Sequence, residues 1–97
     1  MTLAEFKSTL SSATPPPGLG APLEALWHDG RGDWDRAHRT VMSARGRNAA
    51  WVHAYLHRKE GDRDNARYWY DRAQQPVASG LLATEWTAIA SALLDGQ

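Results

Sequence analysis

The chain has no cysteine, and its acidic and basic residues balance at 11 of each. Without cysteine it can form neither a disulfide nor a thiolate metal site, and it has no cysteine nucleophile. A net charge of zero argues against binding to a nucleic-acid backbone, because that affinity depends on an excess of cations. We therefore expect no nucleic-acid partner.

Long apolar runs and catalytic signatures are lacking as well. No segment approaches the roughly 18 consecutive apolar residues of a transmembrane helix, so we expect no membrane partner. The first ten residues lack the apolar stretch of a secretory signal, which makes a cytoplasmic location the expectation. No phosphate loop, dinucleotide fingerprint or nucleophile elbow occurs. The sequence therefore predicts no cofactor, and it favours a role other than catalysis.

What the chain does have is enough apolar surface for one modest core. Apolar residues make up 42% of its 97 residues, and five of them are tryptophans. The apolar residues recur at helical spacing, and no segment alternates with period two, so the predicted fold class is all-α. We expect helices over 2–11, 22–30, 34–44, 49–60, 63–75 and 81–94.

These helices predict a single helical domain over 1–97 with four parts. An N-terminal helical segment (1–14) is followed by a proline-rich connector (15–21), which is either a stiff link or the boundary of a loosely docked N-terminal helix. Next comes a core of two helical hairpins (22–76), and a capping helix follows it (77–97).

An internal repeat underlies the two-hairpin prediction. Shifted by 29 residues, the chain matches itself at seven of the 20 positions 25–44. The matches pair Ala25 with Ala54, His28 with His57, Gly32 with Gly61, Asp33 with Asp62, Asp35 with Asp64, Ala37 with Ala66 and Ala44 with Ala73. Glycine can end a helix in the left-handed conformation, and the aspartate after it can cap the next helix. Each Gly-Asp pair therefore predicts a sharp reversal between two antiparallel helices.

The turn sequences GDWDRA at 32–37 and GDRDNA at 61–66 resemble the tetratricopeptide and Sel1-like group of helical repeats. The resemblance covers about residues 22–76 and implies stacked antiparallel hairpins that form a groove. The period differs, at 29 residues instead of about 34, and two units are few for a free-standing array. The stretch WVHAYLHRKEGD at 51–62, with NA at 65–66 and YWY at 68–70, also resembles a signature of small bacterial proteins. This second resemblance implies a fold and no activity.

Three polar residues form a candidate site on one predicted helix. His53 and His57 lie four residues apart, and Glu60 follows His57 by three, so all three can share a face. Imidazoles with a carboxylate are a half-site for zinc or iron, in which His53 and His57 are the metal candidates. Further ligands would have to come from another helix, with His28, His38 and Asp35 as the options. A nearby carboxylate would also raise the pKa of His53 or His57. The alternative is that His57 and its repeat mate His28 fill packing positions.

Aromatic residues and arginines suggest a second candidate, a binding surface. Consecutive residues on a helix point about 100° apart, so the run Tyr68–Tyr70 cannot lie wholly in one core. Binding surfaces are rich in tryptophan, tyrosine and arginine. The predicted surface comprises Trp51, Tyr55, Arg58, Tyr68, Trp69 and Arg72. The alternative is a core aromatic flanked by partly exposed neighbours.

Two functions from different classes follow from these features. The first is a helical-repeat module that binds a protein, a peptide or another ligand, including a second copy of itself as a homodimer. The second is a small histidine-dependent enzyme or metal-binding protein that uses His53, His57 and Glu60.

Overall fold

The computed structural model describes residues 1–96, and within them the chain forms α-helices and no strand, which confirms the all-α prediction. The predicted C-terminal segment ends at Gln97, which lies outside the described residues. In chain order the elements are α1 (Leu3–Ser8), the short 3-10 helix η1 (Thr9–Ser11), α2 (Ala21–Gly30), α3 (Trp34–Met42), α4 (Arg47–Glu60), α5 (Arg63–Ala73) and α6 (Leu82–Asp95).

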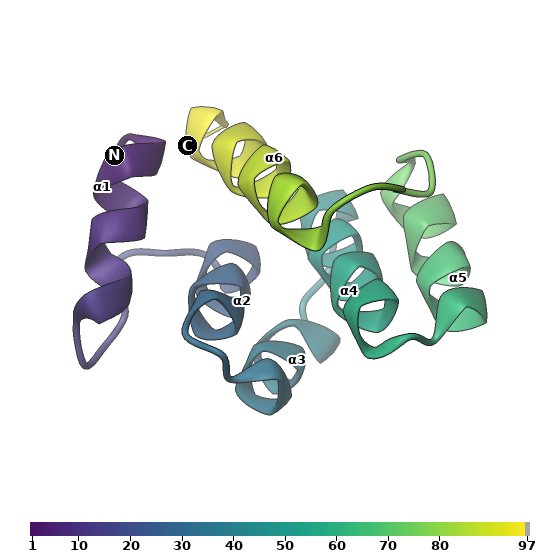
Figure 1. Ribbon diagram of the computed structural model, residues 1–97, viewed down its shortest axis with the longest axis horizontal. Helices are drawn as coiled ribbons and strands as arrows, with labels where there is room; N and C mark the ends of the chain where they lie inside the picture. Colours follow the sequence, from purple (N-terminus) through teal and green to yellow (C-terminus); the bar gives the residue numbers. More distant parts are fainter. Residues whose placement is uncertain (97) are drawn as a thin grey trace.

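Two helical hairpins lie next to each other, α2 with α3 and α4 with α5, and α6 lies across α2 and α4 (Figure 1). Both hairpins turn at the Gly-Asp pairs. Gly32 and Gly61 have φ angles of 84° and 93°, a left-handed conformation that favours glycine. The aspartates that follow cap α3 and α5, because each carboxylate accepts a hydrogen bond from the backbone N–H three residues later, at 3.1 and 3.2 Å.

The backbone hydrogen bonds of the two turns are equivalent as well. The amide of Asp33 donates to the carbonyl of His28 at 2.9 Å, and that of Asp62 donates to the carbonyl of His57 at 3.0 Å. Two of the three matched alanine pairs are at most 3% exposed, which lets the paired helices approach closely: Ala25, Ala37, Ala54 and Ala66. The third pair differs, since Ala73 is buried on α5 whereas Ala44 follows the end of α3 and is half-buried. The two hairpins therefore share their turn geometry and two pairs of buried alanines.

Some helix boundaries differ from the predicted ones. The N-terminal α-helix ends at Ser8 and closes with a 3-10 turn, although Thr2 and Glu5 form the reciprocal capping pair expected at its start. The third predicted helix ends two residues early, at Met42. The fourth, α4, begins two residues before the predicted start, at Arg47, because Gly46 ends the preceding turn with φ 99°.

The core lies between the hairpins, α1 and α6. Its largest fully buried side chains are Phe6, Leu26, Trp27, Val41, Val52, Leu56, Tyr70 and Ile89. Phe6 of α1 stacks on Trp86 of α6 with ring centroids 5.8 Å apart. The N-terminal helix is therefore docked into the core, so the proline-rich segment is a link and not the boundary of a loose helix. Across residues 1–96, no helix combines the length and the apolar character needed to cross a bilayer.

Candidate functional site

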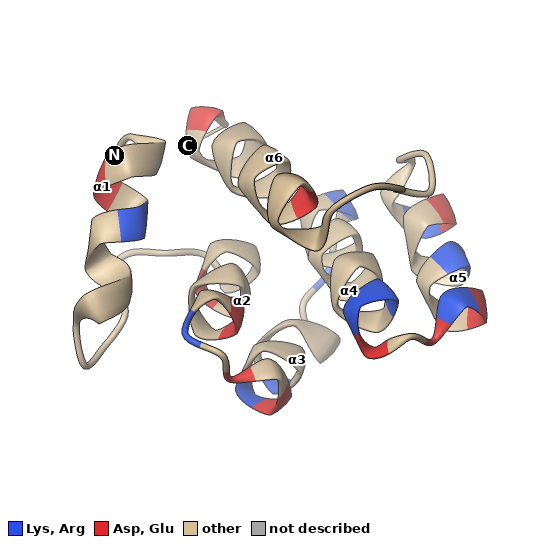
Figure 2. Cartoon of the chain, in the orientation of Figure 1, with Lys and Arg blue, Asp and Glu red and all other residues tan. Residues whose placement is uncertain are grey.

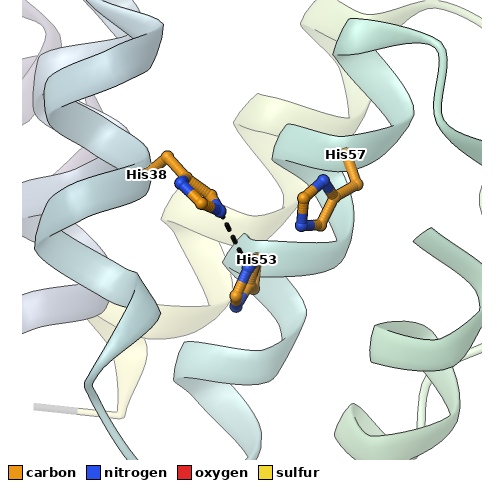
Figure 3. A group of neighbouring side chains, drawn as sticks. All are labelled: His38, His53 and His57. Carbon is orange, nitrogen blue, oxygen red and sulfur yellow. Dashed lines mark hydrogen bonds between the residues drawn. The ribbon is translucent and has the colours of Figure 1, made fainter. Parts of the chain in front are cut away.

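Three histidines meet at the junction between the hairpins. His38 lies on α3, and His53 and His57 lie one turn apart on α4, so all three rings project into the space between these helices (Figure 3). One ring nitrogen from each histidine lies within 4.8 Å of those from the other two. Of the further ligands that the sequence offered for His53 and His57, the structure thus brings His38 to the site. His28 lies on α2 outside this cluster, 3.6 Å from Glu24.

Two hydrogen bonds fix which ring nitrogens are available. The Nε2 atoms of His38 and His53 are 3.1 Å apart, so one of them carries the proton and donates while the other accepts. On the third ring, Nδ1 of His57 is 2.6 Å from Oε1 of Glu60, and an N–H at Nδ1 donates to this carboxylate. The predicted contact between His57 and Glu60 is therefore present. It leaves Nε2 of His57 as that ring's acceptor or ligand atom.

Two tryptophans hold the imidazole rings in position. Trp34 stacks on His38 with centroids 5.0 Å apart and an interplanar angle of 8°, and Trp69 stacks on His53 at 4.0 Å and 17°. Trp34 is itself anchored, because its Nε1 donates to the backbone carbonyl of Leu56 at 2.8 Å. The rings of His53 and His57 also stack on each other, at 4.7 Å. The cluster is thus a packed aromatic stack whose ring orientations are restricted on several sides.

Burial keeps two of the rings uncharged at neutral pH. Loss of solvent, together with the neighbouring His57 and His38, lowers the pKa of His53 to about 4. Burial and the proximity of His57 also lower the pKa of His38, against the opposing effects of Glu60 and Asp35. The expectation that a carboxylate would raise the pKa of His53 was therefore wrong. The Glu60 carboxylate is bonded to His57, and His53 faces two other imidazoles.

The predicted aromatic surface is only partly on the surface. Tyr68 is 54% exposed and Trp69 is half-buried, whereas Tyr70 is buried at 1%. Arg72 stacks over both Tyr68 and Trp69, with its guanidinium carbon 5.6 Å from the centroid of Tyr68 and 5.5 Å from that of Trp69. Trp51 is half-buried against the core. These residues could take part in a surface contact, but they form a smaller patch than predicted.

Two members of the predicted surface have structural partners instead. Tyr55 is 2% exposed, and its hydroxyl donates to Oδ2 of buried Asp29 at 2.8 Å, so its inclusion in a binding surface was wrong. Arg58 is largely buried and pairs with Oε1 of Glu85 at 2.9 Å. Both side chains reach their partners across the interface between helices. They are explained by core packing.

The sequence reasoning missed what Trp34 does and gave His38 no preference over the other possible ligands. Trp34 and His38 are four residues apart on α3, a spacing that puts both on one helix face. This spacing could have pointed to His38, because His53 and His57 on α4 are also four residues apart. It shows that the two residues share a face, but not that this face is turned toward α4.

Comparisons with protein-family models, with curated proteins and with solved structures gave no match to this chain. We therefore infer the function from the geometry of the histidine cluster.

Proposed function

We propose that this protein binds one divalent transition-metal ion of the zinc class through His38, His53 and His57. The observation that carries the proposal is the convergence of three imidazole nitrogens within 4.8 Å of one another, supplied by two helices. Imidazole is the nitrogen ligand that zinc, copper, nickel and iron share. Three such ligands match the count found at catalytic zinc sites, where a fourth position stays open.

The distances support a site that closes with small movements. Nitrogens bound to zinc at about 2.0–2.1 Å in a tetrahedral arrangement lie roughly 3.3 Å apart. The Nε2 atoms of His38 and His53 are already 3.1 Å apart, so an ion would replace the proton they share. The ligand nitrogen of His57 lies within 4.8 Å of the other two, so each of these distances exceeds that spacing by at most about 1.5 Å.

The surroundings of the rings support the same proposal. A metal ligand must be a neutral imidazole, and the lowered pKa values of His38 and His53 keep both rings neutral at pH 7. The bond from His57 Nδ1 to Glu60 is the outer-shell arrangement that orients a metal-binding imidazole and raises its basicity. An ion bound here would act as a Lewis acid on a water or substrate in the fourth position.

Metal content and affinity test the proposal. Protein purified without a histidine tag should bind one equivalent of Zn²⁺ in calorimetry, and Co²⁺ should give the visible absorption of a tetrahedral complex. Replacing His38, His53 or His57 with glutamine should weaken binding at least tenfold in each case. Glu60→Gln should weaken it by about tenfold, since it removes the outer-shell acceptor.

His28→Gln is the matched control, because His28 is also a buried histidine on a hairpin helix but lies outside the cluster. It should leave Zn²⁺ affinity unchanged. Stoichiometric binding that survives all three cluster substitutions would contradict the proposal. Absence of Zn²⁺ and Co²⁺ binding by the folded wild-type protein would do so too.

A second candidate function is a protein-interaction module of the tetratricopeptide type. It is supported by the equivalent turns of the two hairpins and by Tyr68, whose ring is 54% exposed and covered on one side by Arg72. If this patch mediates self-association, light scattering should give a dimer mass for wild type and a monomer mass for Tyr68→Ser. A wild-type monomer across the micromolar range would contradict self-association.

A further inference from the structure

A cavity of about 580 Å³ opens beside the histidine cluster, between the turn that precedes α4 and the end of α5. Its charged and aromatic lining consists of Arg45, Arg47, His53, Trp69, Asp71 and Arg72. Small-molecule sites in proteins have volumes of roughly 300–1,000 Å³, so the cavity has room for a small organic ligand.

The cavity has a strongly positive lining, although the chain has zero net charge and both signs of charge are distributed over its helices (Figure 2). Three arginines and a single aspartate border it, which leaves an excess of two positive charges. In the part of the chain that the structure describes, the ion pairs within 4.0 Å involve other residues, so the guanidinium groups of Arg45, Arg47 and Arg72 have no carboxylate partner at that distance. Arginine without an internal partner is suited to bind phosphate or carboxylate through paired hydrogen bonds.

Two further groups at the cavity offer hydrogen bonds. His53 is 6% exposed, and its Nε2 faces His38. Among residues 1–96, every fully buried side-chain nitrogen or oxygen has a hydrogen-bond partner. The Nδ1 atom of His53 has no such partner, since the hydrogen bond of this ring is made by Nε2. This nitrogen therefore reaches solvent, and His53 borders this cavity. The first turn of α4 lines the cavity too, and its N-cap, Gly46, has no side chain to satisfy the first backbone amides.

One of the three arginines is already held in place. The guanidinium of Arg72 lies over the rings of Tyr68 and Trp69, at 5.6 and 5.5 Å from their centroids. Trp69 in turn stacks on His53, which joins the cavity wall to the histidine cluster. Less side-chain freedom is then lost when Arg72 binds a ligand.

We propose that this cavity binds the phosphate group of a small organic phosphate monoester. The excess of two positive charges matches the charge of a phosphate dianion, and the three guanidinium groups, with the amides of α4, are donors for its oxygens. The two proposed sites share His53, but the phosphate site does not require the metal, because its charge comes from three arginines outside the histidine cluster. A ligand bound here would contact His53 from the side opposite its shared proton.

The test is a titration of chelator-treated protein with phenyl phosphate, benzoate and phenol, followed by amide chemical shifts in NMR. Phenyl phosphate should bind with one site, at least tenfold more tightly than benzoate, and phenol should not bind. Arg47→Gln and Arg72→Gln should each weaken phenyl phosphate binding about tenfold, since each removes charge-assisted hydrogen bonds. Arg67→Gln is the matched control, because Arg67 lies on α5, is 69% exposed and pairs with Asp64 away from this lining.

Three results would overturn the proposal. They are no shift changes with phenyl phosphate at millimolar concentration, equal affinity for benzoate, and equal loss of affinity in Arg67→Gln. If helical content in circular dichroism shows that Arg72→Gln does not fold, Arg45→Gln in the exposed turn replaces it, with the same tenfold loss expected. Because the protein is free of metal throughout, a failure of zinc binding leaves this result unaffected.

Discussion

Acid should destabilise the metal-free protein through His53. This ring is 6% exposed and has a pKa of about 4 in the folded chain, against an ordinary value of 6.5. Between these values the unfolded chain binds a proton that the folded chain does not. The free energy of unfolding therefore decreases as the pH falls from 6.5 to 4, and this contribution is fully retained above 6.5.

The expected loss is large for a domain of this size. At about 1.4 kcal/mol for each pH unit, the interval from 6.5 to 4 corresponds to about 3–4 kcal/mol. Because the folded ring is itself half protonated at pH 4, the loss at that pH is about 3 kcal/mol. Domains are typically stable by about 5–15 kcal/mol, so this is a substantial share. For 97 residues, 3 kcal/mol lowers the melting temperature by about 12 to 24 °C. The lowered pKa of His38 acts in the same direction.

Urea denaturation at a series of pH values, followed by tryptophan fluorescence and circular dichroism, measures this loss. His53→Gln removes the titrating ring, so its unfolding free energy should fall less than that of the wild type between pH 7 and 4. Gly61→Ala is a control that weakens the fold without removing an imidazole, and it should keep the wild-type pH dependence. Equal slopes for wild type and His53→Gln would refute the assignment of acid sensitivity to this ring.

The remaining predictions concern stability at neutral pH. Gly61→Ala should cost about 1–2 kcal/mol, because Gly61 has φ 93° and an added Cβ meets no atom within 4 Å, so the cost comes from backbone conformation alone. Gly61→Asn should cost less, as asparagine tolerates this conformation, and a larger loss for asparagine in thermal unfolding would contradict the explanation. Tyr55→Phe should cost about 1–3 kcal/mol in urea denaturation, because it leaves an oxygen of buried Asp29 without its donor. Tyr68→Phe, at an exposed ring, should change the free energy of unfolding by less than about 0.5 kcal/mol. If Tyr55→Phe and Tyr68→Phe lost the same free energy of unfolding, the hydrogen bond from Tyr55 to Asp29 would contribute nothing.

Local rules predicted the parts of the structure that depend on near neighbours. The Gly-Asp turns follow from backbone preferences over three or four residues, and both were found where the sequence put them. The contact between His57 and Glu60 has the same origin, since a spacing of three residues on a helix nearly fixes the distance.

Features that depend on how helices pack could not be predicted in the same way. His38 and His53 are 15 residues apart, and whether their rings meet is decided by the angle between α3 and α4. Arg58 and Glu85 pair across 27 residues for a similar reason. Tyr55 shows that residue type alone does not identify a binding surface. A tyrosine beside arginine fits both a binding surface and a buried hydrogen bond, and only the position of Asp29 decides between them.

The junction between the hairpins is the part of the core where imidazole rings pack against one another. Where α3 meets α4, three imidazoles and Trp34 pack together, and imidazoles respond to protons and ions whereas leucine and valine do not. A fall in pH therefore acts directly on the junction between α3 and α4, where His38 and His53 lie. The Gly-Asp turns inside each hairpin depend instead on backbone conformation and on capping hydrogen bonds.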